Sequence, residues 1–451
     1  MRRYDVIVVG AGTGNMLLND ELRHFRTAIV EPDRFGGTCL NRGCIPSKMF
    51  VVPAEIATSA RQGRRLGVRS TVDGVDWPAI RERVFGRIDP LHEAAVKHRE
   101  SQGIDVFTEP ARFVGPGELQ VGDERIGADR IVVAAGSRPV IPAITGLAAV
   151  PYHTSDTIMR IDRLPKSMVV VGGGFIAAEM GFVFSAFGCD VTVVQRGPRL
   201  LMAEDDDVSA AFTRHAAGRH RLMLNSEVTR VDRVAGGVAV TVEDANGTRL
   251  VEAEQLLLCV GRTPNTDLLD VRAAGLEIDR HGHLKVDETG ATTMPGVWAL
   301  GDAANHFQLK HLANAEARVV RHNLLHPGTP RRLPVLAAPH AVFSEPQVAS
   351  IGLTEQAARE QGVEYRVSRR DYAETAYGWA LEDTTSFVKI LASPAGGRLL
   401  GAHLIGPHAA LLIQPLIQAM MLGQTAQQLA NEVLYIHPAL TEVVEQALLA
   451  L

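Results

Sequence analysis

The feature that most constrains the fold is a repeated order of apolar strand, glycine-rich turn, helix-like stretch and second apolar strand. Residues 4–9 (YDVIVV) lead into the turn GAGTGN at 10–15, and a second strand follows at 27–30. The same order recurs when residues 168–171 (MVVV) lead into the turn GGGFIA at 172–177. This is the pattern of a parallel βαβ unit that binds a dinucleotide, so we predict two such units.

The residue at the tip of each second strand indicates which nucleotide is bound. Glu31 lies 21 residues after Gly10, and a carboxylate there accepts the hydroxyls of an unphosphorylated ribose, as in FAD or NAD. The matching position in the second unit is Gln195, followed by Arg196 and Arg199. Two guanidinium groups without an acid favour a 2′-phosphate, and hence NADPH over NADH.

Two observations qualify the nucleotide assignment. The third glycine position of the first turn is Asn15, so helix and strand are expected to lie slightly further apart there. The chain also has 40 Arg and only 6 Lys, so Arg196 and Arg199 have an alternative explanation in an Arg-rich composition.

Bulk composition narrows the functional classes. At 451 residues the chain is too long for one ordinary domain, and we expect three or four. A net charge of −5 argues against nucleic acid or an anionic membrane as a partner. No apolar run approaches about 18 residues, so neither a signal peptide nor a membrane span is expected. Four cysteines do not form a disulfide framework, which favours the cytoplasm.

Two of the four cysteines stand five residues apart in GGTCLNRGCIPSK, residues 36–48. Five residues of regular helix rise about 7.5 Å, which exceeds the roughly 6.8 Å reach of a disulfide. If Cys39 and Cys44 are bonded, the segment is therefore not a regular helix, and Gly43 provides local freedom. Cys189 and Cys259 adjoin apolar strands and are expected to be core residues.

This cysteine segment resembles the active-site segment of the glutathione reductase and lipoamide dehydrogenase family. The resemblance covers the whole chain: both glycine turns, GSRP at 136–139, GRTPN at 261–265, Gly301-Asp302, and HPALTE at 437–442. It implies an α/β fold with two Rossmann-like dinucleotide-binding domains, for FAD and NADPH, and a C-terminal α+β dimerisation domain. The implied domains are 1–150 (FAD-binding), 151–265 (NAD(P)H-binding), 266–335 (completing the FAD domain) and 336–451 (dimerisation).

The resemblance also implies roles for individual residues. Cys44 would lie against the flavin as the charge-transfer thiolate, and Cys39 would attack the substrate. Lys48 would lie near the flavin and pair with Glu179. His437, oriented by Glu442 and supplied by the other subunit of a homodimer, would be the acid-base. For His306 and His311, a packing or capping role is as well supported as a catalytic one.

The remaining implied residues contact the cofactors, and Asp302 among them would bind the FAD ribitol. The expected cofactor-binding residues are Gly10, Gly12, Asn15, Glu31, Gly37, Thr38, Lys48, Gly136, Gly301 and Asp302 for FAD, and Gly172, Gly174, Phe175, Ala177, Gln195, Arg196, Arg199 and Gly261 for the nicotinamide nucleotide. No metal site is expected.

The substrate is narrowed by departures from other members of the family. The C-terminus lacks the second redox pair of mercuric reductases and large thioredoxin reductases, and Phe175 replaces the Tyr usual in glutathione reductases. Segments such as AYGWALEDT (376–384) and IHPALTEVVEQALL (436–449) resemble a branch that reduces the disulfide of a neutral sugar-inositol thiol. Two alternatives remain: a reductase of another low-molecular-weight disulfide, and a flavin-binding redox sensor without turnover.

Overall fold

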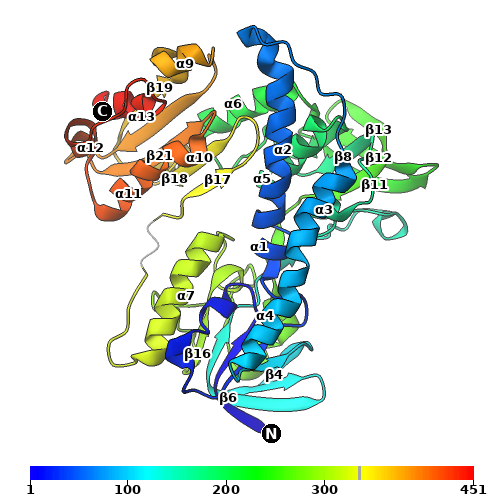
Figure 1. The fold of residues 1–451 in the computed structure, drawn as a ribbon, viewed down its shortest axis with the longest axis vertical. Helices are drawn as coiled ribbons and strands as arrows, with labels where there is room; N and C mark the ends of the chain where they lie inside the picture. The colour runs from blue at the N-terminus through cyan, green and yellow to red at the C-terminus, as the bar shows by residue number, and fades with distance from the viewer. Residues whose placement is uncertain (334–336) are drawn as a thin grey trace. The chain divides into compact units, whose positions relative to one another are not determined.

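The computed structural model describes residues 1–333 and 337–451, and its course is shown by colour in Figure 1. The expected boundary at 335/336 lies outside the described residues. The chain divides into two compact units. The described residues of unit 1 are 1–47, 78–140 and 261–333, and those of unit 2 are 48–77, 141–260 and 337–451.

Unit 1 is built on a seven-stranded sheet of order β3-β2-β1-β6-β5-β4, with β16 paired to β6. The strands β1, β2, β3, β6 and β16 run parallel, as a dinucleotide-binding sheet requires. Their bounds are β1 (Arg2–Val9), β2 (Thr27–Val30), β3 (Asp105–Phe107), β4 (Ala111–Gly115), β5 (Glu118–Val121), β6 (Glu124–Val133) and β16 (Val297–Ala299). The strand β16 brings the Gly301-Asp302 strand end into this sheet.

The helix expected after the first glycine turn is not present, and this expectation was wrong. Two short 3-10 turns, η1 (Gly14–Met16) and η2 (Asp20–Leu22), take its place. Arg99 donates to the carbonyl oxygens of Asn15 and Leu18, each at 2.8 Å, and to the Asn15 side chain. These carbonyls are therefore bonded to a guanidinium rather than to helical N–H groups.

Helices α4 (Pro90–Ser101) and α7 (Lys310–Leu325) of unit 1 pack on the sheet, and helix α1 (Gly37–Asn41) carries Cys39. Helix α3 (Trp77–Ile88) begins one residue before the unit boundary. The long helix α2 (Cys44–Gln62) begins in unit 1 and continues into unit 2 (Figure 1). A small antiparallel pair, β7 (Ser137–Pro139) with β15 (Arg262–Pro264), joins the two closing turns.

Unit 2 contains the second dinucleotide-binding sheet, of parallel order β10-β9-β8-β14. Here the expected helix is present: α5 (Phe175–Ala186) starts directly after Gly174, which is its N-cap. The other elements are β8 (Ser167–Val171), β9 (Asp190–Gln195), β10 (Arg221–Leu224), β14 (Gln255–Leu258), α6 (Asp206–Ala217) and an antiparallel sheet of β11 (Glu227–Val234), β12 (Gly237–Asp244) and β13 (Gly247–Ala253).

The C-terminal part of unit 2 is an antiparallel sheet of order β17-β18-β21-β20-β19 with helices packed on it. The strands are β17 (His340–Val342), β18 (Val348–Gly352), β19 (Arg366–Asp371), β20 (Phe387–Ala392) and β21 (Leu399–Ile405). The helices are α8 (Glu355–Glu360), α9 (Ala376–Ala380), α10 (Ala409–Leu412), α11 (Gln414–Leu422), α12 (Ala426–Glu432) and α13 (Thr441–Leu449). Two parallel sheets with glycine turns and an α+β C-terminal part confirm the predicted fold class. Within the described ranges, every helix is too short or too polar to cross a membrane.

Candidate active site

The two cysteines of the redox segment meet at a break between two helices. Cys39 lies in α1, which ends at Asn41, and Cys44 is the first residue of α2. A Cβ on Gly43 would lie 3.0 Å from the carbonyl oxygen of Thr38, so the backbones at the break are in close contact. Cys39 hydrogen-bonds to Cys44, and both are present as thiols. The segment is not a regular helix, as a Cys39–Cys44 disulfide would require, although both cysteines are thiols here.

The electrostatics of the thiol pair involve a lysine that the sequence analysis did not identify. The contact with Cys44, followed by burial, raises the pKa of the Cys39 thiol, whereas the charge of Lys310 lowers it. Burial lowers the pKa of Lys310, and both cysteines oppose that effect. The Nζ of Lys310 donates to Thr13 Oγ1 at 2.8 Å, which holds it on the first glycine turn. A cation therefore lies close enough to the thiols to favour a thiolate.

The first glycine turn is shaped by close backbone contacts. Gly10 has φ +103°, and a Cβ there would lie 2.3 Å from the carbonyl oxygen of Ala134. A Cβ on Gly37 would lie 2.8 Å from the Cα of Gly12, so the turn touches the start of the cysteine helix. The helix after this turn is missing, and the Asn15 side chain is bound by Arg99.

Glu31 lies beside this turn, where its carboxylate accepts from the backbone N–H of Ala11 at 2.8 Å and of Asp33 at 3.0 Å. Burial raises its pKa, and these two N–H groups oppose the rise. Each carboxylate oxygen has a further lone pair that a ribose hydroxyl could use. A turn without room for side chains and an acidic residue at its edge fit the adenosine part of the expected FAD.

The second part of the expected FAD site lies at the end of β16. Ser137 Oγ donates to Asp302 Oδ2 at 2.6 Å, and Arg262 Nε donates to Ser137 Oγ at 2.9 Å. The Gly301 N–H donates to Glu316 at 2.7 Å. This network orients the Asp302 carboxylate, and Ser137 and Arg262 were not predicted from the sequence. Of the other expected FAD positions, Gly136 has positive φ, and the hydroxyl of Thr38 lies 3.5 Å from Arg262. Gly261, which was expected to contact the nicotinamide nucleotide, also has positive φ.

The Lys48–Glu179 pair that the resemblance implied is formed within unit 2. Lys48 Nζ lies 2.7 Å and 2.6 Å from the two carboxylate oxygens of Glu179. The Phe343 N–H also donates to Glu179 at 3.0 Å, and the ammonium lies 4.5 Å from the Phe343 ring centroid. Glu179 is buried, so its charge is held by these donors rather than by water.

The second glycine turn resembles the first in geometry. Gly172 has φ +114°, and a Cβ there would lie 2.3 Å from the carbonyl oxygen of Cys259. Phe175 is half exposed and Ala177 is buried in the helix that follows. Gln195 packs under the turn, because a Cβ on Gly173 would lie 2.8 Å from its Cδ.

The two arginines expected to read a 2′-phosphate are in different states. Arg196 is exposed, whereas Arg199 forms a close ion pair with Asp206. Asp206, which belongs to the acidic run at 204–207, was not predicted from the sequence.

The expected acid-base pair is formed in the C-terminal part of unit 2. His437 Nδ1 lies 2.7 Å from Glu442 Oε1 in α13, while the imidazole side chain is 73% exposed. The carboxylate can orient the ring, and the other ring nitrogen remains accessible.

Cys189 and Cys259 were expected to be core residues, whereas the roles of His306 and His311 were left open. Cys189 and Cys259 are buried, and burial raises the pKa of both thiols, to about 12 for Cys189. The His306 ring stacks near Phe307 at 4.2 Å between centroids, and His311 is exposed at the start of α7.

Comparison with known proteins identifies the family. The chain is 45% identical to mycothione reductase of Mycobacterium tuberculosis over an alignment of 463 positions, which covers the whole of both chains. It is 32% identical to dihydrolipoyl dehydrogenase of Halobacterium salinarum, over 98% of this chain and 95% of that one. The HOCl-induced flavoprotein disulfide reductase RclA from Escherichia coli superposes with a TM-score of 0.86 at 25% identity, covering 99% of each chain.

Two matches to family descriptions cover nearly all of the chain. Residues 4–317 match "Pyridine nucleotide-disulphide oxidoreductase", and residues 338–448 match the dimerisation domain of the same proteins. The chain is therefore an oxidoreductase that belongs to the pyridine nucleotide-disulphide oxidoreductase family.

Proposed function

We propose that this enzyme uses NADPH and FAD to reduce mycothione, the disulfide of mycothiol, to two thiols. The observation that carries the proposal is the contact between Cys39 and Cys44 at the helix break. It occurs in a chain that is 45% identical over its whole length to a mycothione reductase. Domains 1–150 and 266–335 would hold FAD, 151–265 would hold NADPH, and 336–451 would dimerise.

The reduction of the substrate consists of two thiol–disulfide exchanges. The Cys39 thiolate attacks one sulfur of the substrate, which forms a mixed disulfide and releases the first thiol. The Cys44 thiolate then attacks the sulfur of Cys39, which closes the Cys39–Cys44 disulfide and releases the second thiol. The chemistry that FAD supplies when bound is transfer of two electrons from NADPH to that disulfide. Lys310 would favour the thiolate form at both exchanges.

The first leaving thiolate needs a proton, or the exchange readily reverses. We assign this proton to the partner subunit's His437, with Glu442 fixing the tautomer of the ring. The family's dimerisation domain and several exposed apolar side chains in the C-terminal part of unit 2 support a homodimer. Those side chains are Leu411, Met421, Leu422, Leu434 and Ile436, which are 68–99% exposed. A cytoplasmic location and the absence of nucleic-acid partners complete the proposal, on the grounds of cysteine use and net charge.

A comparison of substrates tests the function. With NADPH as donor, we expect the enzyme to reduce mycothione with a much higher kcat/KM than glutathione disulfide. Preference for glutathione disulfide would identify a reductase of another small disulfide. Flavin that NADPH bleaches but no disulfide reoxidises would instead identify a redox sensor.

A subunit-exchange experiment tests the shared site. His437→Ala should lose about 10²–10⁴-fold in disulfide turnover, because general acid catalysis is removed. Reduction of the flavin by NADPH should be nearly unaffected, because that half-reaction does not need this proton. After exchange with inactive Cys39→Ser protein, each mixed dimer has one site with both defects and one with neither, so activity should return. Failure to recover after confirmed exchange would show that His437 acts within its own chain.

A further inference from the structure

Arg199, one of the two arginines expected to bind the 2′-phosphate, already forms an ion pair with a carboxylate. Its Nη2 pairs with Asp206 Oδ1, and the two side chains are 34% and 53% exposed. Its Nε is buried and, in the described parts of the chain, has no hydrogen-bond partner. Arg199 thus retains an unused donor, while part of its charge is neutralised by its neighbour.

The segment that carries Arg199 is fixed to the second glycine turn. Leu201 N–H donates to the carbonyl oxygen of Gly173 at 2.7 Å, and Leu200 N–H donates to Thr213 Oγ1 at 3.0 Å. Gln195, the residue at the ribose-reading position, donates to the carbonyl oxygen of Arg199 at 3.4 Å. Arg199 therefore belongs to the edge of the turn where the adenosine of a nucleotide is read.

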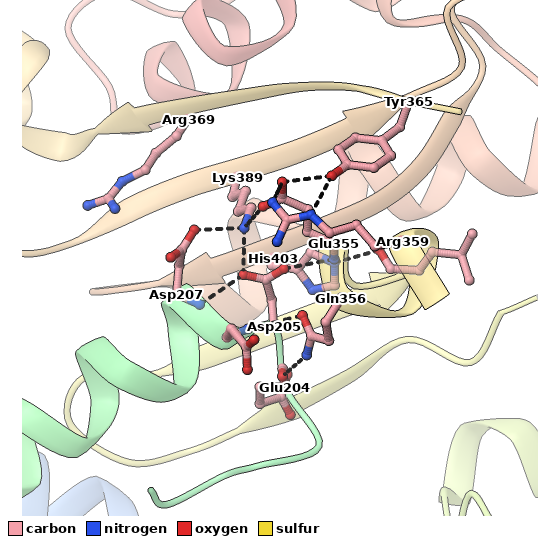
Figure 2. Close-up of polar contacts among 12 residues, drawn as sticks. Glu204, Asp205, Asp207, Glu355, Gln356, Arg359, Tyr365, Arg369, Lys389 and His403 are labelled. Carbon is pink, nitrogen blue, oxygen red and sulfur yellow. Dashed lines mark hydrogen bonds and ion pairs between the residues drawn. The ribbon is translucent and has the colours of Figure 1, made fainter. Parts of the chain in front are cut away.

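Asp206 is the member of the acidic run that pairs with Arg199. Figure 2 shows that its neighbours, Asp205 and Asp207, contact Lys389 instead. The Nζ of Lys389, which is 3% exposed, lies 2.9 Å from Asp205, 2.7 Å from Asp207 and 2.6 Å from Glu355. Burial alone would lower the pKa of Lys389, but these hydrogen bonds outweigh it and raise the pKa. The start of α6 is thereby held by a lysine of the C-terminal sheet.

The remaining contacts fix the backbone on both sides of Asp206. Glu204 accepts from Ser350 Oγ at 2.5 Å and lies 2.7 Å from His340. Gln356 accepts from the Asp206 N–H at 3.2 Å and donates to the Glu204 carbonyl oxygen at 2.8 Å. The backbone around Asp206 is therefore held by residues other than Arg199.

We propose that Asp206 is a specificity-determining residue that competes with the 2′-phosphate of NADPH for Arg199 and so limits the preference for NADPH over NADH. The inference rests on the proposed use of NADPH. A phosphate that binds Arg199 must displace or share the Asp206 contact, and its negative charges then lie near a fixed carboxylate. Removing the Asp206 charge should therefore strengthen binding of a 2′-phosphate and leave unphosphorylated adenosine nucleotides unaffected.

The test is calorimetric titration of the holoenzyme with adenosine 2′,5′-bisphosphate and with 5′-AMP. Asp206→Asn should tighten the bisphosphate by about three- to fivefold, the range of an exposed ion pair, and leave 5′-AMP unchanged. Asp207→Asn is the matched control, because it removes the same charge one residue away. Asp207 contacts Lys389 instead of Arg199. In an Arg199→Ala background, Asp206→Asn should give no gain.

Each other result has a defined meaning. Weaker bisphosphate binding in Asp206→Asn would show that Asp206 positions Arg199 for the phosphate, which overturns the proposal. An equal gain in Asp207→Asn or in the Arg199→Ala background would show general charge repulsion and also overturn it. If the wild-type enzyme binds the bisphosphate no better than 5′-AMP, the proposed use of NADPH fails instead.

Discussion

The two glycine turns begin alike and continue differently. Gly10 and Gly172 both have φ above +100°, and a Cβ on either would lie 2.3 Å from the carbonyl oxygen of the residue that follows a neighbouring strand. After the second turn, α5 runs for 12 residues. After the first, the chain forms two 3-10 turns whose carbonyls bind Arg99. The glycine pattern thus determines the turn, while the residues that follow determine whether a helix forms.

The sequence after each turn explains the difference. FIAAEMGFVFSA has an almost wholly apolar, helix-compatible composition, and most of it is buried. NMLLNDEL contains Asn15, Asn19 and Asp20, which compete for backbone hydrogen bonds. The Asn19 side chain does accept from the N–H of Glu21. Without a helix dipole at the first turn, Lys310 on Thr13 supplies positive charge there.

The largest expected effect comes from substituting the glycine of each turn, because each turn is expected to bind a different cofactor. Gly10→Ala and Gly172→Ala each place a Cβ against a backbone oxygen at a φ that L-residues avoid. We expect Gly10→Ala to be purified without flavin absorbance. Gly172→Ala should stay yellow but lose at least about 100-fold in the rate of flavin reduction at low NADPH, since distortion costs several kcal/mol.

The control for these substitutions is Gly236→Ala. Gly236 also has positive φ, but an added Cβ would meet no atom within 4 Å. This variant should retain both the flavin and the NADPH reaction. Normal flavin content in Gly10→Ala would refute the assignment of FAD to the first turn.

A smaller effect is expected from the residues that read the ribose. Arg196→Ala with Arg199→Ala should raise the KM for NADPH by about 10- to 150-fold, the range of a charge-assisted hydrogen bond. The KM for NADH should be nearly unchanged, because NADH has no 2′-phosphate. If the wild-type enzyme had a higher kcat/KM with NADH than with NADPH, the prediction that the Gln195 site binds a 2′-phosphate, unlike the Glu31 site, would be wrong.

A structural feature can be predicted from the sequence when its interacting residues are close together along the chain. The two parallel sheets and the strand that ends at Gly301-Asp302 follow from local patterns, and both were predicted. The missing first helix was not, because Arg99 binds Asn15 across 84 positions. The same holds for Lys310, which is 297 positions from Thr13.

One compositional signal could have identified Lys310 before the structure was known. The chain has only six lysines among 46 basic residues, so a lysine retained in an Arg-rich chain deserves a specific explanation. Three of the six, Lys48, Lys310 and Lys389, are partly or wholly buried and contact functional or structural acids, hydroxyls or thiols. A compact ammonium fits such sites better than a planar guanidinium.

The smallest expected effect concerns Lys310, the cation bound to the first turn. Lys310 lowers the pKa of the Cys39 thiol, so Lys310→Met should raise it and move the onset of thiolate formation to higher pH. At a pH below the Cys39 pKa of both the wild type and the variant, the reduced variant should react with iodoacetamide about tenfold more slowly than the reduced wild type. This is the size of effect expected for loss of one nearby charge. Lys310→Arg keeps the charge and should leave the pH profile near that of the wild type. Lys285→Met removes an exposed lysine paired with Glu277 and controls for net charge. An unshifted profile in Lys310→Met would mean that the charge of Lys310 does not act on the thiols.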